Sequence, residues 1–270
     1  MMDVRWLGKE DRRTEEVCHV KQNQGRKALL SAISIILAAS IALVLMPVQT
    51  WAATAPQPAA SPSASSTQAG QGSDGTVWYL AEGYTGGDFD TYVLVQNPGT
   101  QAAKVTLDFQ LPPGLQAPSY KVDVPAGTRK TVHLDELPGL GATDVSTRVV
   151  SNRPVVAERA MYFSYNGKVG GHDSIGVKYP AATWYLAEGY TGGDFDTYVL
   201  VQNPGSATTG VTLDFQLPPG KSAPSYKFDL PAHTRKTVHL DELPGLDATD
   251  VSTKVTSPLP VVAERAMYFN

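Results

Sequence analysis

Hydrophobic side chains recur at every second position in several short runs of the chain. The clearest run covers residues 105–111, where Val, Leu, Phe and Leu alternate with Thr, Asp and Gln. Shorter alternating runs cover residues 120–124, 132–134 and 155–163. A period of two indicates strands with one buried and one exposed face. No helical periodicity with capping residues is sustained in this part of the chain, so we predict an all-β body.

Clusters of proline and glycine lie between these runs, at 97–99, 112–114, 125–127 and 137–139. Asn166-Gly167 is the strongest signal for a two-residue hairpin in the chain. About eight short strands, within about 100 residues, are typical of an antiparallel β-sandwich of immunoglobulin-like size. We therefore expect this architecture.

A long internal repeat then divides the chain. Residues 78–163 recur as residues 184–269, shifted by 106 positions without insertion or deletion, and 71 of the 86 positions are identical. We therefore predict two tandem immunoglobulin-like β-sandwich domains, the first repeat over 77–181 and the second repeat over 182–270. A second catalytic site adds little to an enzyme, whereas a second binding or spacer module adds avidity or reach.

The differences between the two repeats are clustered. Most of them fall at 100–104, 115–127 and 148–154 and at the corresponding positions of the second repeat. The blocks that do not change are Trp78–Gly99, Thr128–Leu140 and Val155–Phe163. The variable segments are mostly predicted turns and edges.

The second repeat ends at Asn270, before a counterpart of the hairpin and final strand that we expect over 164–179. Its last predicted strand, 261–269, therefore has no hairpin partner in this sequence. An exposed strand edge can pair with another chain. Two hypotheses follow: the sequence is a piece of a longer repeat array, or the edge accepts a donated strand and gives a homo-oligomer by β-edge pairing.

Three segments precede the repeats. Residues 1–27 form a charged leader on the cytoplasmic side, and 28–52 contain an apolar run preceded by Arg26 and Lys27. This run is interpreted either as a signal peptide or as an uncleaved membrane anchor. Residues 53–76 are rich in Pro, Ala and Ser and are predicted to be a flexible linker. Both interpretations place the repeats outside the cell, secreted or on the extracellular face of the membrane.

Charge and cysteine content exclude several classes. The formal net charge is −4, which gives no basic footprint for nucleic acid. Contact with the membrane is expected only through the N-terminal segment. The single cysteine, Cys18, precedes the repeats, so the repeats form no disulfides and no thiolate metal sites.

Three motifs of the first repeat carry a resemblance to a known family. They are Trp78–Tyr84 (WYLAEGY), Asn97–Gly99 (NPG) and Val156–Phe163 (VAERAMYF). Together they resemble a repeat of bacterial, largely actinobacterial, extracellular proteins whose family has no known function. The resemblance implies an exported bacterial protein and no particular activity.

A fainter similarity is to the sensory rhodopsin transducer family of small β-sandwich proteins. It runs through 78–84, 120–137 and 151–156. This resemblance implies the sandwich fold, oligomerisation, and binding of a partner or small ligand. Members of that family are cytoplasmic, whereas this chain is predicted to be exported, which argues against a role in rhodopsin signalling.

The densest group of candidate functional residues lies in the glycine-rich loop at 81–91 and beside it. Aromatic side chains there could form a platform on which a sugar stacks, and carboxylates could bind its hydroxyls. We therefore predict a ligand site in each repeat. The candidates are Trp78, Glu82, Tyr84, Asp88 and Asp90 in the first repeat and Trp184, Glu188, Tyr190, Asp194 and Asp196 in the second.

The carboxylates of this loop also raise the question of calcium. Glu82, Asp88 and Asp90, with loop carbonyls, could supply some of the six to eight oxygens that Ca²⁺ requires. Their spacing is not that of a known calcium loop, and acids of this kind also cap turn amides or lie in solvent. Gly170–Asp173 (GGHD) is a weak metal signal. We predict no metal and no cofactor.

Two further groups have structural interpretations. Arg159 falls on the apolar row of its predicted strand, so it needs a carboxylate partner, and Glu82 or Asp135 could serve. His133 and Asp135 share one strand face, as hydrolase components do. No Gly-x-Ser-x-Gly nucleophile motif accompanies them, so we interpret His133 as a surface histidine beside a carboxylate.

These observations favour an exported, non-catalytic tandem protein that acts as a cell-surface spacer or interaction module. The alternative is a module that binds glycan or cell-wall polymer through the aromatic and acidic loop of each repeat. A second alternative is a polysaccharide hydrolase with two carboxylates as acid and base. The partners expected are a cell-wall polymer, a surface protein or a second copy of the chain.

Overall fold

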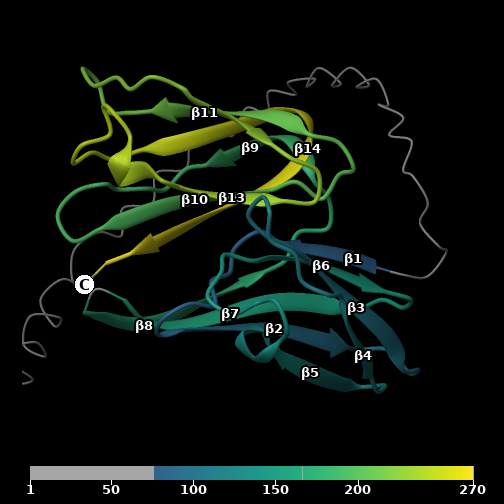
Figure 1. Ribbon diagram of the computed structural model, residues 1–270. Coiled ribbons are helices and arrows are strands. Elements are labelled where there is room, and N and C mark those ends of the chain that lie inside the picture. The colour runs from purple at the N-terminus through teal and green to yellow at the C-terminus, as the bar shows by residue number, and fades with distance from the viewer. Residues whose placement is uncertain (1–75, 166, 270) are drawn as a thin grey trace, which may run out of the picture. The chain divides into compact units, whose positions relative to one another are not determined.

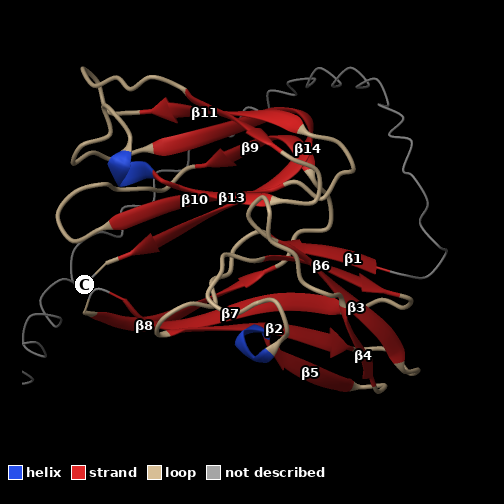
Figure 2. Ribbon diagram, viewed as in Figure 1, coloured by secondary structure: helices blue, strands red, loops and turns tan. Residues whose placement is uncertain are grey.

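The computed structural model describes residues 76–165 and 167–269. This part of the chain is all-β, with several antiparallel sheets and two three-residue 3-10 turns at Leu134–Glu136 and Leu240–Glu242 (Figure 2). None of its helices is long and apolar enough to span a membrane. The described residues belong to one compact unit. The predicted leader, the signal or anchor segment and the linker lie outside the described residues except for Thr76, which was predicted as the last linker residue and instead begins strand β1.

The first repeat contains two four-stranded antiparallel sheets, with strand orders β1-β6-β3-β4 and β5-β2-β7-β8 (Figure 1). The central strands of both carry the alternating pattern: in β3, for example, Val105 and Leu107 are buried while Lys104 is exposed. The strands are β1 Thr76–Leu80, β2 Phe89–Asn97, β3 Ala103–Gln110, β4 Tyr120–Val124, β5 Thr128–His133, β6 Ser146–Ser151, β7 Val156–Tyr165 and β8 Lys168–Ile175.

The strands β7 and β8 form the hairpin that the Asn-Gly signal predicts. Tyr165 pairs with Lys168, and the register continues to Glu158 and Ile175. Gly167 has a φ of 78°, a left-handed conformation that glycine adopts without steric cost. The hairpin extends the sheet beyond β7, so β7 is not an edge in the first repeat.

The second repeat has the same pairings for its corresponding strands. Tyr198 pairs with His239 in β10 and β13, and Tyr92 pairs with His133 in β2 and β5. One long strand, β14, covers the positions of both β6 and β7, with a register irregularity between Thr256 and Val261. The strands are β9 Ala181–Leu186, β10 Asp196–Gln202, β11 Thr209–Gln216, β12 Tyr226–Leu230, β13 Arg235–His239 and β14 Ser252–Tyr268.

Each repeat has its own hydrophobic core between its sheets. In the first repeat it is built from β-branched and leucine side chains such as Val93, Leu107 and Val149, with Trp78 at one side. In the second, Val199, Leu213 and their neighbours occupy the corresponding places. A third, smaller cluster joins Met161 to Leu200, Ala266 and Tyr268, and so contains side chains from both repeats.

The sequence predictions for the strands are confirmed in their main features. The runs at 105–111, 120–124, 132–134 and 155–163 correspond to β3, β4, β5 and β7. One detail differs: Leu134, placed in a strand by its alternation with His133, begins a 3-10 turn. The Leu134 side chain is still buried, so the alternating pattern predicted its burial correctly but its backbone conformation incorrectly.

Candidate functional site

The repeats meet where loops at one end of the first repeat pack on the outer face of the sheet β13-β10-β14. We call these loops the docking end of the first repeat, and the residues that receive them the docking face of the second. The docking end comprises Ala81, Glu82, Gln110, Leu111 and Asp144. The docking face comprises Gln202, Arg235, Thr237, Glu264 and Tyr268.

Arg235 is the centre of the docking face. Its side chain is fully buried, and its Nη1 lies 2.6 Å from Oδ1 of Asp144. Its Nη2 donates to the carbonyl of Ala81 at 3.3 Å, and its backbone N–H donates to the carbonyl of Leu111 at 3.1 Å. The Thr237 hydroxyl also donates to Asp144, at 2.9 Å. A guanidinium that loses its water needs such partners. The docking end supplies an ion pair to Nη1 and a hydrogen-bond acceptor to Nη2, whereas Nε has no hydrogen-bond partner among the described residues.

Glu82 lies in a second buried ion pair. Nη2 of Arg159 in β7 lies 2.7 Å from Oε2 of Glu82, and both side chains are almost completely buried. The sequence prediction that Arg159 pairs with a carboxylate is confirmed, with Glu82 rather than Asp135 as the partner. The other Glu82 oxygen accepts a hydrogen bond from the Tyr268 hydroxyl at 3.0 Å. The second repeat therefore completes the shell around the pair.

Glu264 brings a second carboxylate to the same place. It accepts hydrogen bonds from the backbone N–H of Glu82 at 2.7 Å and from the Ser174 hydroxyl at 2.9 Å, and it lies 4.0 Å from Arg159. Two carboxylates thus share one guanidinium, and backbone and hydroxyl donors satisfy the remaining lone pairs. Both carboxylates of this network thus have partners, whereas Nε of Arg159 has no hydrogen-bond partner among the described residues.

His172 in β8 borders this network. Nη1 of Arg159 lies 3.0 Å from Nδ1 of His172, so Nδ1 is placed as an acceptor, which requires it to carry no proton. Burial lowers the pKa of His172 below its ordinary value, and the Arg159 charge lowers it further, while the Glu82 carboxylate opposes both. The geometry and the pKa direction agree on a neutral histidine.

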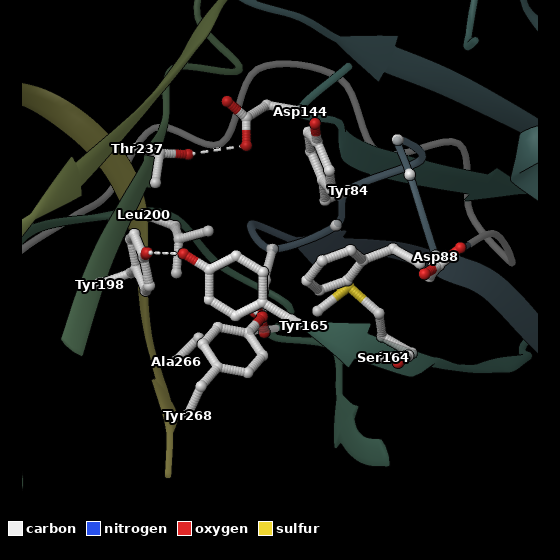
Figure 3. Close-up of a pocket in the computed structure, with 16 residues that line it drawn as sticks. Tyr84, Asp88, Asp144, Ser164, Tyr165, Tyr198, Leu200, Thr237, Ala266 and Tyr268 are labelled. Carbon is white, nitrogen blue, oxygen red and sulfur yellow. Dashed lines mark hydrogen bonds between the residues drawn. The ribbon is translucent and has the colours of Figure 1, made fainter. Parts of the chain in front are cut away.

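A cleft of about 560 Å³ opens beside this network, between the two repeats (Figure 3). Its walls are rich in aromatic side chains, and a hydrogen bond from Thr237 to Asp144 crosses one side. Tyr165 and Tyr198 bond each other through their hydroxyls at 3.1 Å. The aromatic lining residues are Tyr84, Phe89, Tyr165, Tyr198 and Tyr268, and the acidic ones are Glu82, Asp88 and Asp144.

The glycine-rich loop shapes one wall of the cleft. The Tyr84 ring packs edge-on against Phe89, with centroids 5.2 Å apart, and lies directly over Gly86. A Cβ at residue 86 would displace that ring from its present position. Tyr84 remains 36% exposed, whereas burial raises the pKa of Tyr268, with a further rise from the Glu82 carboxylate. The cleft thus has one accessible and one buried tyrosine.

The predicted ligand residues of the first repeat do not form one exposed platform. The Trp78 ring is buried in the core, and its indole N–H donates to the carbonyl of Val155 at 2.7 Å. Glu82 is enclosed by Arg159 and the second repeat. Only Tyr84 and Asp88 line the cleft in accessible positions. Of the predicted sugar-stacking platform, only the part in the glycine-rich loop is accessible in the cleft.

In the second repeat the counterparts lie differently. Glu188 and Asp194 are exposed, and Tyr190 is half-buried against Phe195 with centroids 5.1 Å apart. Trp184 is half-buried and donates to the carbonyl of Val261 at 2.8 Å. The two copies of the loop thus differ most at the glutamate, which the second repeat encloses at Glu82 and which is exposed at Glu188.

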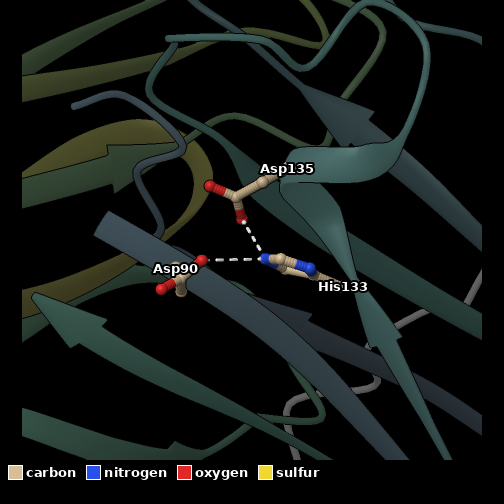
Figure 4. A group of neighbouring side chains, drawn as sticks. All are labelled: Asp90, His133 and Asp135. Atoms are coloured by element: carbon tan, nitrogen blue, oxygen red, sulfur yellow. Dashed lines mark hydrogen bonds and ion pairs between the residues drawn. The ribbon is translucent and has the colours of Figure 1, made fainter. Parts of the chain in front are cut away.

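Asp90 belongs to a separate cluster with His133 and Asp135 (Figure 4). Nε2 of His133 lies 3.1 Å from Oδ1 of Asp90 and 3.3 Å from Oδ2 of Asp135. Asp135 also accepts the backbone N–H of Thr91 at 2.9 Å, and burial raises its pKa. The prediction of a histidine beside a carboxylate is confirmed, and the structure adds the second carboxylate.

The second repeat forms the same cluster from Asp196, His239 and Asp241. There Nζ of Lys168 lies 2.7 Å from Oδ2 of Asp196. One histidine and two carboxylates are ligands that zinc accepts. Nε2 of His239 lies 3.4 Å from Oδ1 of Asp196 and 3.3 Å from Oδ2 of Asp241, and it makes no hydrogen bond among the described residues. The grouping of Glu82 with Asp88 and Asp90 as calcium ligands is not found: Glu82 pairs with Arg159, and Asp90 with His133.

The model of a family of unknown function, DUF5719, matches residues 46–267. The chain belongs to this family. Membership in DUF5719 covers both repeats and assigns no activity. No curated protein matches the chain.

Two solved structures resemble parts of this DUF5719 chain. The crystal structure of Thermotoga maritima 1070 is 18% identical, with a TM-score of 0.36, and the match covers 39% of this chain and 95% of that one. The Anabaena sensory rhodopsin transducer is 22% identical, with a TM-score of 0.29, and the match covers 32% of this chain and 96% of that one. The structural similarity to the transducer is weak.

The sequence did not predict most of the docking residues. Asp144, Arg235, Thr237, Glu264 and Tyr268 were not candidates, because no local motif marks a contact between distant segments. A signal was nevertheless present. The blocks that do not differ between the repeats contain Arg235, Thr237, Glu264 and Tyr268, and Asp144 is also identical to its counterpart. Contact residues were thus preserved where turn residues changed.

We predict that Arg159→Ala lowers the free energy of unfolding by about 3–5 kcal/mol, because it leaves Glu82 as a buried charge without its partner. Its counterpart Arg265 is half-buried, and Arg265→Ala should cost less than about 1 kcal/mol. Urea unfolding of the two variants measures both. Equal losses would contradict the assignment of Arg159 to a buried network.

We also predict a dependence on pH. At pH values between the lowered pKa of His172 in the folded chain and its ordinary pKa of 6.5, the unfolded chain binds a proton at this histidine that the folded chain does not bind. The free energy of unfolding therefore falls as the pH falls through this window. His172→Gln should lose less stability between about pH 7 and about pH 5.5 than the unaltered chain. His233→Gln, at an exposed position, is the control and should behave like the unaltered chain.

Proposed function

We propose that this DUF5719 chain is an exported, non-catalytic protein that acts as a cell-surface spacer or interaction module. In this proposal the repeats are two immunoglobulin-like sandwiches joined in series, with the N-terminal segment as signal or anchor and the following segment as tether. The observation that supports it most is the docking of the first repeat on the second. A spacer must resist bending between its units, and buried polar contacts specify one relative orientation.

The network around Arg159 also supports a non-catalytic role. A general acid or base needs access to a substrate and a carboxylate whose charge is not already neutralised. Glu82 is buried against Arg159 and bonded by Tyr268, while Glu264 accepts two protein donors. Both carboxylates are fully used within the protein, as in a structural network.

A second candidate function, binding of glycan or cell-wall polymer, is favoured by the cleft. Its accessible wall combines Tyr84 with Asp88, an aromatic face beside a carboxylate, which suits a sugar ring and its hydroxyls. Two of the opposite residues, Tyr165 and Tyr198, come from the hairpin and from the second repeat. The site would therefore require both repeats, and the chain would contain one such cleft rather than two independent loops.

For the spacer function, we predict that the unaltered chain unfolds in one calorimetric transition and that Arg235→Glu divides it into two. Repeats that are coupled by an interface melt together, and loss of the interface lets each melt separately. The charge reversal places a carboxylate against Asp144. The matched control is Arg129→Glu at the exposed counterpart, which should leave a single transition. An unshifted single transition in both variants would contradict a stabilising interface.

For the second candidate, we predict that Tyr84→Ala lowers retention of the chain on peptidoglycan or on a glycan array by about tenfold or more, equivalent to at least one stacked ring. Tyr190→Ala changes the identical residue outside the cleft and should leave retention unaltered. Retention that is equal in both variants and in the unaltered chain would exclude the cleft as a glycan site.

A further inference from the structure

The docking contact inside the chain uses only half of the surfaces that the two repeats possess. The first repeat contributes its docking end, and the second contributes its docking face. Every residue of both sets has an identical counterpart 106 positions away. The chain therefore also carries a second docking face on the first repeat and a second docking end on the second repeat.

The second docking face is exposed. It consists of Gln96, Arg129, Thr131, Glu158 and Tyr162, which lie on β5, β2 and β7 in the register of their counterparts. Arg129 is exposed, whereas Arg235 is fully buried. Tyr162 is 57% exposed, whereas Tyr268 is 7% exposed. A surface with this sequence is buried in one repeat and lies open in the other.

This exposed face is also hollowed. A depression of about 510 Å³ is lined by Leu94, Gln96, Arg129 and Glu158, among others. In the second repeat the counterparts of Gln96 and Arg129 contact Gln110 and Leu111 of the docking end: Gln202 bonds the Gln110 amide, and Arg235 N–H bonds the Leu111 carbonyl. The depression therefore marks the place where a docking end fits.

The second docking end is exposed as well. It consists of Ala187, Glu188, Gln216, Leu217 and Asp250. Glu188, Gln216 and Asp250 are exposed, whereas Glu82 and Gln110 are buried. It presents two carboxylates, Glu188 and Asp250, and the exposed face presents the Arg129 guanidinium. Opposite charges thus lie at the positions where the contact inside the chain places its buried ion pair.

We propose that the exposed docking end of one chain binds the exposed docking face of a second copy of this chain. The inference rests on the proposed function as an interaction module and names its partner. Asp250 of one copy would pair with Arg129 of the other, and Glu188 with Tyr162. This face-to-end contact is distinct from the β-edge pairing expected from the sequence.

The contact joins two different surfaces, so a bound pair of chains still has one free docking end and one free docking face. Such a heterologous contact continues into rings or filaments. It is weaker than the contact within the chain, since it lacks the linkage between the repeats. Association should therefore depend on concentration.

Sedimentation velocity of the full chain over a 100-fold range of concentration tests the proposal, in a nonionic detergent that covers the apolar N-terminal run. We expect species larger than dimers at high concentration. Arg129→Glu and Asp250→Arg should each raise the apparent dissociation constant by about 30-fold or more. The double variant Arg129→Glu/Asp250→Arg should associate again, because the charges are exchanged and still opposite. Lys121→Glu, exposed on β4, should change nothing.

Two results would overturn the proposal: a chain that stays monomeric at every concentration, or association that neither single variant weakens. Both Arg129 and Asp250 are exposed, so the variants should fold, and the restored association of the double variant checks this directly. The calorimetric test of the spacer function uses Arg235, which belongs to the contact within the chain. Failure of one proposal is therefore distinguishable from failure of the other.

Discussion

The arrangement of the two repeats depends on the cost of burying charge without a partner. Arg159 and Arg235 are both withdrawn from solvent, and each is matched by a carboxylate, Glu82 or Asp144. A buried guanidinium tolerates few positions for its partner, because unmatched donors in a low dielectric are costly. The hydrophobic cores hold each repeat together, whereas the Arg235–Asp144 pair and the bonds of Tyr268 and Glu264 to Glu82 hold one repeat on the other.

The same requirement explains why two nearly identical sequences have different surroundings. The loop that contains Glu82 is enclosed by β14, while its counterpart with Glu188 is exposed. No local difference in sequence accounts for this, since both loops are identical. Position in the chain accounts for it: the second repeat covers Glu82 at this end of the first repeat.

The cleft and the interface are consequences of one contact. Docking brings Tyr198 and Tyr268 of the second repeat opposite Tyr84 and Tyr165 of the first, and so creates an aromatic cavity that neither repeat has alone. A spacer function and a binding function are therefore not exclusive in structural terms. Any ligand that fills the cleft would also hold the two repeats together.

The sequence by itself determined the elements: alternating side chains predicted the strands, Asn166-Gly167 the hairpin, and the apolar row of β7 the burial of Arg159. These features are local, and a period of two is visible without knowledge of neighbours. Only the tertiary structure decided that Trp78 lies in the core, that Glu82 pairs with Arg159, and that Asp144 meets Arg235. The contacts of Trp78 and Glu82 join positions that are 77 residues apart within one repeat, and the Asp144–Arg235 pair joins different repeats. Burial and charge in the folded chain select these partners, and no short sequence motif indicates them.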